Sequence, residues 1–287
     1  MRYFRVQRGN SSGLVVDDGT EAYDLTDVGG TVSSYLDLYR AASLSGRSVD
    51  DIAKDLAEGA PTADLSTEDL LVPVEADEIW ASGVTYRISE EARTEESDKP
   101  DVYIDVYESE RPEVFFKATP SRTVGPGEAV GIRGDSDWDV PEPELAVVLH
   151  HGDIAGFTVG NDVSSRSIEG ANPLYLPQAK VYDRCCSIGP CVASTESVGD
   201  PHDLEMTMAI RRDGETVYED STTTAEMVRT CEELASYLNR HNAVPETAVL
   251  LTGTALVPDD DFTLAPGDAV EITIEDVGTL RNDVVQV

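Results

Sequence analysis

Apolar residues from position 73 onward fall in short runs that are separated by turn-forming residues. The clearest runs are EVFFKA (113–118), ELAVVL (144–149) and AVLLTGTAL (248–256). Runs of this length and composition predict β-strands. Residues 223–242 differ, because their apolar positions recur at helical spacing behind a capping box formed by Thr223 and Glu226, and we expect one long helix there. Many strands with few helices predict an α+β fold that is rich in β-structure.

The first part of the chain has a different pattern. A hairpin is predicted around Asp18 and Gly19, followed by two short helices within 32–44 and 48–59. Pro73 precedes the first of the later strands, so we place a domain boundary near residue 72. We therefore expect a small N-terminal α/β domain, residues 1–72, and a larger domain, residues 73–287. The polar segment 87–106 is either a solvated linker or a mobile lid.

Two glutamates stand at the head of the apolar run at 144–149. Side chains at i and i+2 of a strand share a face, so Glu142 and Glu144 are predicted to be neighbours. Neighbouring carboxylates repel each other unless a cation joins them or one of them is protonated. The pair is therefore either part of a site for a divalent cation or the solvated end of a strand in an acid-rich chain.

Asp162 ends the next predicted strand, which follows a tight turn within HHGD (150–153). The strands of a hairpin are antiparallel, so the end of the second strand lies beside the start of the first. Asp162 is therefore predicted to lie beside Glu142 and Glu144. Three carboxylates without a histidine or cysteine among them suit Mg²⁺ or Mn²⁺ and argue against zinc.

Lysine is rare in this chain, which has only Lys54, Lys99, Lys117 and Lys180. Lys180 follows the apolar segment PLYLP (173–177). A lysine in an apolar setting can have a lowered pKa and can exchange protons with a substrate. The alternative is a lysine that pairs with surface acids, and we favour the functional interpretation.

The net charge is −35, from 56 acidic and 21 basic residues, while 40% of the residues are hydrophobic. Such a surface repels phosphate backbones, which argues against nucleic acid as a partner. Acids spread along a chain of normal apolar content are typical of a folded protein from a salt-saturated cytoplasm. We found neither an apolar stretch of membrane-spanning length nor a secretory signal, so we expect a soluble cytoplasmic protein without a membrane partner.

The cysteines and histidines lack the spacing of a metal site. Three of the four cysteines lie in CCSIGPC (185–191), without paired C-x₂-C units, and we expect them to be small core residues. His150 and His151 are adjacent at the predicted hairpin tip, and we expect no useful cluster of the four histidines.

Five motifs in a fixed order resemble the fumarylacetoacetate hydrolase superfamily. They are EPELAVVL (142–149), GFTVGNDVSSR (156–166), PQAK (177–180) with GP (189–190), LLTGTAL (250–256), and LAPGD with VGTL near the end (264–280). The resemblance covers nearly all of residues 78–287 and implies a mixed β-roll catalytic domain behind a small N-terminal domain. It also implies that Glu142, Glu144 and Asp162 bind a metal ion, that Lys180 is the active-site lysine, and that the chain forms homodimers or homotetramers.

The superfamily includes C–C bond hydrolases, decarboxylases, isomerases and hydro-lyases. Its hydrolases commonly carry a lid histidine that activates water, and here Ser89 stands at the corresponding position. This departure, together with WASGVTY (80–86) and EGANPLYLPQAK (169–180), resembles the 2-keto-3-deoxy-pentonate dehydratases. These enzymes convert 2-keto-3-deoxyarabinonate or 2-keto-3-deoxyxylonate to 2,5-dioxopentanoate. The resemblance thus implies a small α-keto acid as substrate and Mg²⁺ or Mn²⁺ as cofactor.

The resemblance also suggests roles for individual residues. We expect Lys180 to transfer the proton at C3, and Glu113 to protonate or position the departing C4 hydroxyl. Thr254 is expected to hold the substrate carboxylate, with Ser89 and Thr279 as further substrate contacts. Two alternatives stay open: an acylpyruvate hydrolase or oxaloacetate decarboxylase of the same superfamily, and a metal-holding protein without catalytic activity.

Overall fold

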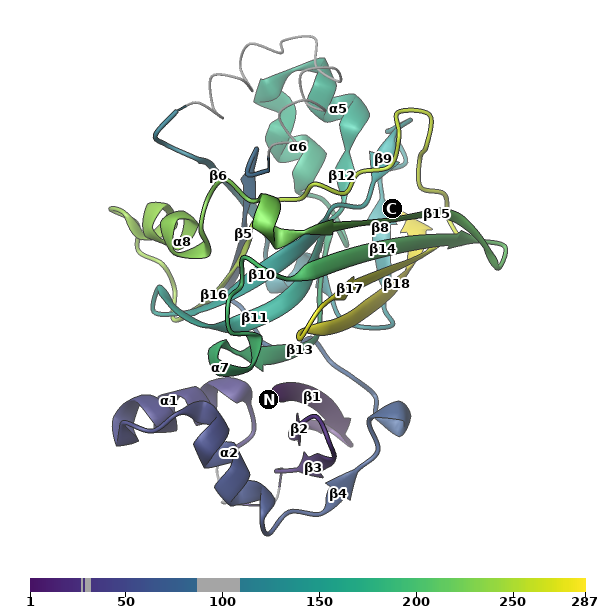
Figure 1. The fold of residues 1–287 in the computed structure, drawn as a ribbon. Helices are drawn as coiled ribbons and strands as arrows, with labels where there is room; N and C mark the ends of the chain where they lie inside the picture. The colour runs from purple at the N-terminus through teal and green to yellow at the C-terminus, as the bar shows by residue number, and fades with distance from the viewer. Residues whose placement is uncertain (27, 29–31, 87–108) are drawn as a thin grey trace.

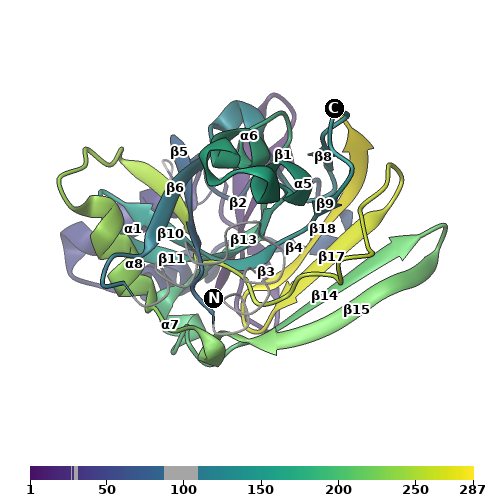
Figure 2. The same cartoon turned by 90° about the horizontal axis from the view of Figure 1, so that it is seen from above.

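Three β-sheets form most of the protein (Figures 1 and 2). The computed structural model describes residues 1–26, 28, 32–86 and 109–287. The largest sheet within these residues has eleven strands, which follow the path β4-β3-β2-β1-β13-β11-β10-β16-β5-β6, with β7 beside β13. In chain order its strands are β1 (Arg2–Arg8), β2 (Ser11–Asp17), β3 (Ala22–Asp24), β4 (Thr62–Ala63), β5 (Glu78–Gly83), β6 (Glu113–Ala118), β7 (Thr123–Val124), β10 (Pro143–His150), β11 (Asp153–Asp162), β13 (Cys186–Ser194) and β16 (Thr247–Leu251).

A five-stranded sheet of order β15-β14-β17-β18-β8 and a two-stranded sheet β12-β9 accompany the large one. Their strands are β8 (Ala129–Ile132), β9 (Asp139–Val140), β12 (Ser164–Ser165), β14 (Glu205–Arg212), β15 (Glu215–Thr223), β17 (Ala269–Ile274) and β18 (Gly278–Gln286). The pairs β16–β5 and β18–β8 are parallel, whereas β10–β11 and β14–β15 are antiparallel. The prediction of a β-rich α+β fold with mixed sheets is confirmed.

Helices are short and lie around the sheets (Figure 1). The α-helices are α1 (Tyr35–Ser45), α2 (Val49–Ala57), α5 (Arg166–Ala171), α6 (Leu176–Lys180), α7 (Thr195–Val198) and α8 (Cys231–Asn239), and the 3₁₀ turns are η1 (Leu65–Thr67), η2 (Pro120–Arg122), η3 (Pro173–Tyr175) and η4 (Thr224–Glu226). In Figure 1, α5 and α6 lie at the end of the molecule opposite to α1 and α2. Within the described residues, no helix combines the length and the apolar character that crossing a membrane requires.

Strand β10 is buried on both of its faces. Alternate side chains of a strand point to opposite faces, and here Leu145, Val147 and Leu149 join one core cluster while Ala146 and Val148 join another. A strand covered on both sides needs a continuous apolar run instead of an alternating pattern. This explains why ELAVVL lacks polar residues after its first position. All four cysteines are buried and unbridged, as expected for small core residues.

The N-terminal segment is joined to the large sheet by β1, which pairs with β13 at Arg2↔Ala193 and Tyr3↔Val192. The hairpin predicted around Asp18 and Gly19 is confirmed by the antiparallel pair β2–β3. Helices α1 and α2 also form where predicted, each with a serine at its N-cap, Ser34 and Ser48. The boundary near residue 72 stays a prediction, since the sheet is continuous from β1 into β13.

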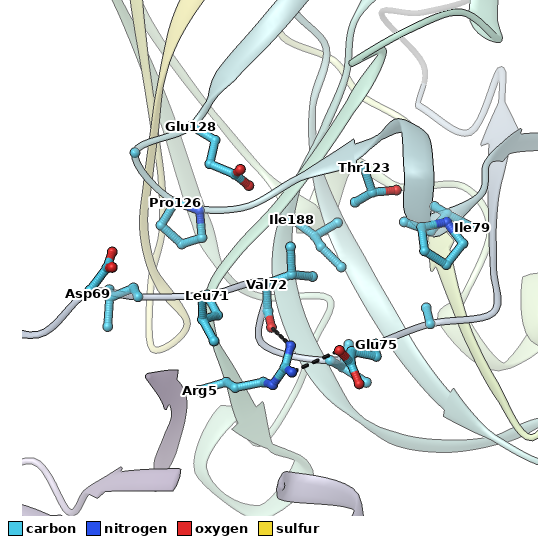
Figure 3. Close-up of a pocket in the computed structure, with 15 residues that line it drawn as sticks. Arg5, Asp69, Leu71, Val72, Glu75, Ile79, Thr123, Pro126, Glu128 and Ile188 are labelled. Carbon is cyan, nitrogen blue, oxygen red and sulfur yellow. Dashed lines mark hydrogen bonds and ion pairs between the residues drawn. The ribbon is translucent and has the colours of Figure 1, made fainter. Parts of the chain in front are cut away.

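A cavity of about 490 Å³ marks the junction after residue 72 (Figure 3). Arg5 of β1 crosses it, with its guanidinium 2.8 Å from Glu75 and 3.5 Å from the carbonyl oxygen of Val72. Pro126 and Ile188 line the opposite wall. The segment that follows the predicted boundary is therefore held by contacts to both β1 and the core of the larger part.

The long helix predicted over 223–242 is wrong in its first half. Helix α8 begins only at Cys231, with Thr230 as its N-cap. Before it, Met227 forms a bridge with Tyr86, and the Val228 N–H donates to the carbonyl oxygen of Thr85. These long-range backbone bonds replace the intrahelical ones, so the Thr223 hydroxyl caps only the single turn of η4.

We predict that Gly156→Ala destabilises the protein. Gly156 lies in β11 opposite Ser194, and a Cβ atom there would be 2.7 Å from the carbonyl oxygen of Ala193. The backbone of β13 must shift to admit it, at a cost of about 1–3 kcal/mol in the free energy of unfolding. Urea titration in molar KCl measures the difference.

Gly59→Ala is the matched control, because a Cβ atom at Gly59 meets nothing within 4 Å. We expect its free energy of unfolding to change by less than about 1 kcal/mol. Equal stabilities of the two variants would contradict the close packing of β11 on β13.

Candidate active site

Glu142, Glu144 and Asp162 meet at one end of the β10–β11 hairpin. The Asp162 N–H donates to the carbonyl oxygen of Glu142 at 2.9 Å, and Glu144 lies opposite Gly160. One carboxylate oxygen of each residue lies within 4.8 Å of the other two, and none of the three residues is more than 3% exposed. The structure thus brings together the three carboxylates that the antiparallel geometry predicts, and it excludes the solvated strand end.

A tight turn after β16 contributes to this group. The Gly253 N–H donates to Glu144 Oε2 at 2.5 Å. Gly253 has a φ of +92°, and a Cβ atom there would collide with the Thr85 hydroxyl. Only glycine fits such a conformation without strain. The glycine of LLTGTAL therefore allows a backbone amide to approach a buried carboxylate.

Three buried cations surround the carboxylates. Lys180 Nζ lies 2.9 Å from Glu142, 3.2 Å from Asp162 and 2.7 Å from the Ser164 hydroxyl. Lys117 Nζ lies 2.5 Å from Asp162 Oδ1. Arg166 Nη2 lies 3.2 Å from Glu142 Oε1. Each of the three buried cations is thereby placed against Glu142 or Asp162, as burial of a charge requires.

The local fold explains where these cations come from. Arg166 begins α5, whose N-cap Ser165 accepts from the Ile168 N–H. Lys180 is the last residue of α6, and Pro177 in the first turn favours the start of that short helix. Strand β12 pairs with β9, which holds Ser164 beside Val140 and close to the start of β10. The short helices α5 and α6 therefore bring the chain back toward Asp162, so that Lys180 contacts it.

The electrostatics favour a bound divalent cation. Burial raises the pKa of Glu144 well above its ordinary value, and the charges of Asp162 and Glu142 raise it further. Burial lowers the pKa of Lys117, but the charge of Asp162, the neighbouring Cys185 and Cys186 and the hydrogen bond to Asp162 together outweigh this, and the net shift is upward. A cation between the carboxylates would relieve their repulsion, and the all-oxygen donor set suits Mg²⁺ or Mn²⁺.

Lys180 is buried as predicted, but its surroundings are more polar than PLYLP suggested. Its ammonium contacts two carboxylates and a hydroxyl, and the apolar contact is the Phe115 ring, 5.6 Å from Nζ to the centroid. Glu113 is two residues before Phe115 in β6 and shares its face. Glu113 also pairs with Gly83 across the sheet, and its carboxylate lies against the Gly83 Cα. Glu113 and Lys180 therefore both lie near Phe115.

The predicted substrate-binding residues Thr254, Thr279 and Ser89 are less closely connected to the three carboxylates. Thr254 follows Gly253, and its hydroxyl accepts from the Leu256 N–H at 3.0 Å. Thr279 is exposed on β18 and pairs with the Thr273 hydroxyl at 2.9 Å, and no described contact joins it to the carboxylates. Ser89 and the predicted lid, 87–106, lie outside the described residues. The roles of all three residues stay predictions.

Sequence reasoning missed several residues of this site. Lys117, Arg166, Ser164 and the Gly253 N–H all contact one of the three carboxylates or Lys180. A signal existed for Lys117, because it is one of only four lysines and ends the apolar run EVFFK. Arg166 and Ser164 lie in the motif GFTVGNDVSSR, which was used for the resemblance but not for contacts.

Comparisons with known proteins extend the picture to the whole chain. Residues 78–285 match the family described as fumarylacetoacetate (FAA) hydrolase, C-terminal. The chain is 60% identical, over 289 residues and 100% of both chains, to a Haloferax volcanii protein named probable 2-keto-3-deoxyxylonate dehydratase. It is 46% identical over 213 residues, 72% of each chain, to a 2-dehydro-3-deoxy-D-arabinonate dehydratase of Saccharolobus solfataricus.

A solved structure of 2-keto-3-deoxy-D-arabinonate dehydratase, complexed with magnesium and 2,5-dioxopentanoate, has the same fold. It covers 100% of this chain and 99% of its own, with a TM-score of 0.85 and 34% identity. The site described above is built almost entirely from the residues that match the family. The protein belongs to the fumarylacetoacetate hydrolase family, and the resemblance seen in its motifs is confirmed.

We predict opposite effects of Glu144→Gln with and without Mg²⁺. The folded-state pKa of Glu144 is raised, so its stabilising contribution is complete below the unfolded pKa and is lost as the pH rises through the folded value. Without metal at neutral pH, the variant should therefore be at least as stable as the wild type. With Mg²⁺, the wild type should gain stability and the variant should gain little.

Thermal unfolding with EDTA or with excess Mg²⁺ measures both effects. Glu205→Gln removes an equal charge from an exposed position of β14 and serves as control. A Glu144→Gln variant that is stabilised by Mg²⁺ as much as the control would contradict the metal site.

Proposed function

We propose that this protein is a Mg²⁺-dependent hydro-lyase that removes water from a 2-keto-3-deoxy-pentonate and yields 2,5-dioxopentanoate. The observation that carries the proposal is the buried group of three carboxylates, two of which are in direct contact with Lys180. Two similar chains, one matched over its full length, are named for dehydration of such acids. The related solved structure has magnesium and the dehydration product in its name.

The donor set fits the metal and the substrate together. Three carboxylates leave further coordination positions for oxygen atoms of a ligand. An α-keto acid can supply two of them, from its carboxylate and its 2-oxo group. Bound in this way, Mg²⁺ supplies Lewis acidity that makes the C3 protons of the substrate easier to remove.

We assign proton transfer at C3 to Lys180. Its ammonium is held by Glu142 and Asp162, which are also the proposed metal ligands. A divalent cation held by the same carboxylates would weaken their attraction for the ammonium, which would favour the neutral amine that a base requires. Lys117 is paired with Asp162 as well and places a second positive charge beside that carboxylate.

We assign to Glu113 the protonation of the departing C4 hydroxyl. Loss of the C3 proton and of this hydroxyl as water leaves a C3–C4 double bond conjugated with the 2-oxo group. A proton then moves from C5 to C3, and the resulting C4–C5 enol becomes the C5 aldehyde by taking up a proton at C4. Lys180 and Glu113, which both lie near Phe115, would serve the two ends of this system.

The substrate names of the two relatives are compatible with one another. The chain is similar to a xylonate-named and to an arabinonate-named dehydratase. A 2-keto-3-deoxy-pentonate has a single stereocentre, C4, so xylose and arabinose of the same series give the same compound. We infer one substrate for this enzyme whichever pentose supplies it.

We also infer a cytoplasmic enzyme that works in high salt as a homodimer or homotetramer. The net charge of −35 supports the salt-rich setting, and one similar chain is from Haloferax volcanii. The family resemblance supports the assembly. Assays and unfolding experiments should therefore contain molar KCl, which screens the repulsion between surface carboxylates.

The activity is tested by product identification. The protein is incubated with 2-keto-3-deoxy-D-xylonate in molar KCl, with Mg²⁺ or with EDTA, and the products are identified by mass spectrometry. We expect loss of one water with formation of 2,5-dioxopentanoate only when Mg²⁺ is present. Turnover of an acylpyruvate or of oxaloacetate, with none of the pentonate, would overturn the proposal in favour of a hydrolase or decarboxylase.

The two catalytic roles are separated by solvent exchange at C3. Lys180→Ala should lower kcat by roughly 10²–10⁴-fold and should also abolish uptake of deuterium at C3 of the substrate. Glu113→Gln should slow elimination but leave C3 exchange in place, because its residue acts only on the leaving group. Proton NMR in D₂O follows the exchange, with an enzyme-free sample as blank.

Lys54→Ala is the control, because Lys54 is exposed on α2. Wild-type turnover in Lys180→Ala would exclude its role as the base. Loss of C3 exchange in Glu113→Gln would mean that Glu113, and not only Lys180, acts at C3.

A further inference from the structure

A second group of potential metal ligands lies at the other end of the β10–β11 hairpin. His150 ends β10, His151 lies in the turn, and Glu246 precedes β16. One ligand atom of each residue lies within 4.8 Å of the other two. Six residues separate Glu144 from His150, so at about 3.4 Å per residue the two groups are roughly 20 Å apart along β10.

The backbone fixes this arrangement. His151 has a φ of +51° and Gly152 a φ of +86°, which together form a two-residue hairpin turn. The His151 N–H donates to the carbonyl oxygen of Glu246 at 2.8 Å, so the turn is tied to the segment that carries the carboxylate. The two imidazole rings are 4.5 Å apart between centroids. Little reorganisation is needed for the three side chains to share one ion.

The His150 ring has a nitrogen that can bind a metal ion. Its Nδ1 is buried and has no hydrogen-bond partner among the described residues. A neutral imidazole is the ligand form for divalent transition metals.

We propose that His150, His151 and Glu246 form a second metal site, which takes a divalent transition metal that prefers imidazole, such as Zn²⁺ or Ni²⁺. Two nitrogen donors and one carboxylate suit these ions. The carboxylates at the other end of the hairpin offer only oxygen and suit Mg²⁺. The two sites therefore differ in the metal they select. The histidine pattern alone predicts no cluster, and the third potential ligand, Glu246, is added by the structure.

Arg40 competes with a metal ion for the Glu246 carboxylate. In the metal-free arrangement its guanidinium pairs with Glu246, and it also lies 3.2 Å from Asp37 of the same helix. A bound metal must take the Glu246 carboxylate from Arg40 and lie close to its positive charge. Arg40 belongs to α1, so its pair with Glu246 joins the N-terminal segment to the start of β16. Metal binding would replace this contact with one between Glu246 and the two histidines of the hairpin.

The test is Zn²⁺ binding measured by equilibrium dialysis in molar KCl, with excess Mg²⁺ to occupy the carboxylate site. We expect the wild type to bind one Zn²⁺ ion. His151→Asn, which tolerates the positive φ, and Glu246→Gln should each weaken binding by about tenfold or more. Arg40→Gln should strengthen it severalfold, since it removes the competing cation.

His241→Asn is the matched control, because His241 is an exposed histidine in the loop after α8 and has a φ of +57°. It should leave Zn²⁺ binding unchanged. Equal losses in His241→Asn and His151→Asn would show binding to histidines in general and would overturn the proposal. No gain in Arg40→Gln would also overturn it, because the site could not then include Glu246.

Cu²⁺ provides an independent spectroscopic test of the donor set. Electron paramagnetic resonance of the Mg²⁺-saturated protein with one equivalent of Cu²⁺ should show coupling to two imidazole nitrogens. The coupling should fall to one nitrogen or fewer in His151→Asn and should keep both nitrogens in Glu144→Gln. A spectrum without nitrogen coupling would assign the ion to carboxylates and contradict the second site.

Discussion

The burial of three like charges side by side is the constraint on which the rest of this protein depends. Glu142, Glu144 and Asp162 are almost fully removed from solvent, and each is held by a different partner: arginine and lysine, a backbone amide, and two lysines. These partners come from β6, α5, α6 and the turn after β16. The sheet order brings these elements together and thereby supplies the partners that allow the carboxylates to be buried.

The positively charged side chains of Lys117, Arg166 and Lys180 act differently from a metal ion. Their positive charges offset those of Glu142 and Asp162, whereas the partner of Glu144 among the described residues is the Gly253 N–H, and the pKa of Glu144 is raised. A proton and a metal ion therefore compete for the Glu144 carboxylate. In the mechanism that we propose, Lys180 both offsets the charge of two carboxylates and transfers a proton, so its two roles would be linked through the metal ion.

Local geometry made part of this site predictable. A two-residue turn between antiparallel strands fixes the register, so Asp162 could be placed beside Glu142 from the sequence alone. The contacts of Lys117 could not, because they require β6 to reach β10 through β5 and β16. The start of α8 was misplaced for a similar reason: residues 227–228 pair with Tyr86 and Thr85, which are distant in sequence. Glu246 approaches His151 only through the pairing of β16 with β10.

The distribution of lysines has a practical consequence for handling the protein. Lys117 and Lys180 are buried, and the α-amino group of Met1 is paired with Asp50 with only 5% of its side chain exposed. Among the described lysines, Lys54 on α2 alone presents its amine to solvent. Amine-directed dyes, biotin reagents and immobilisation surfaces would therefore meet few targets here, and within the described chain they would attach to a helix far from the carboxylates. Within the described chain, the scarcity of exposed lysines therefore favours selective labelling of Lys54 without any engineered residue.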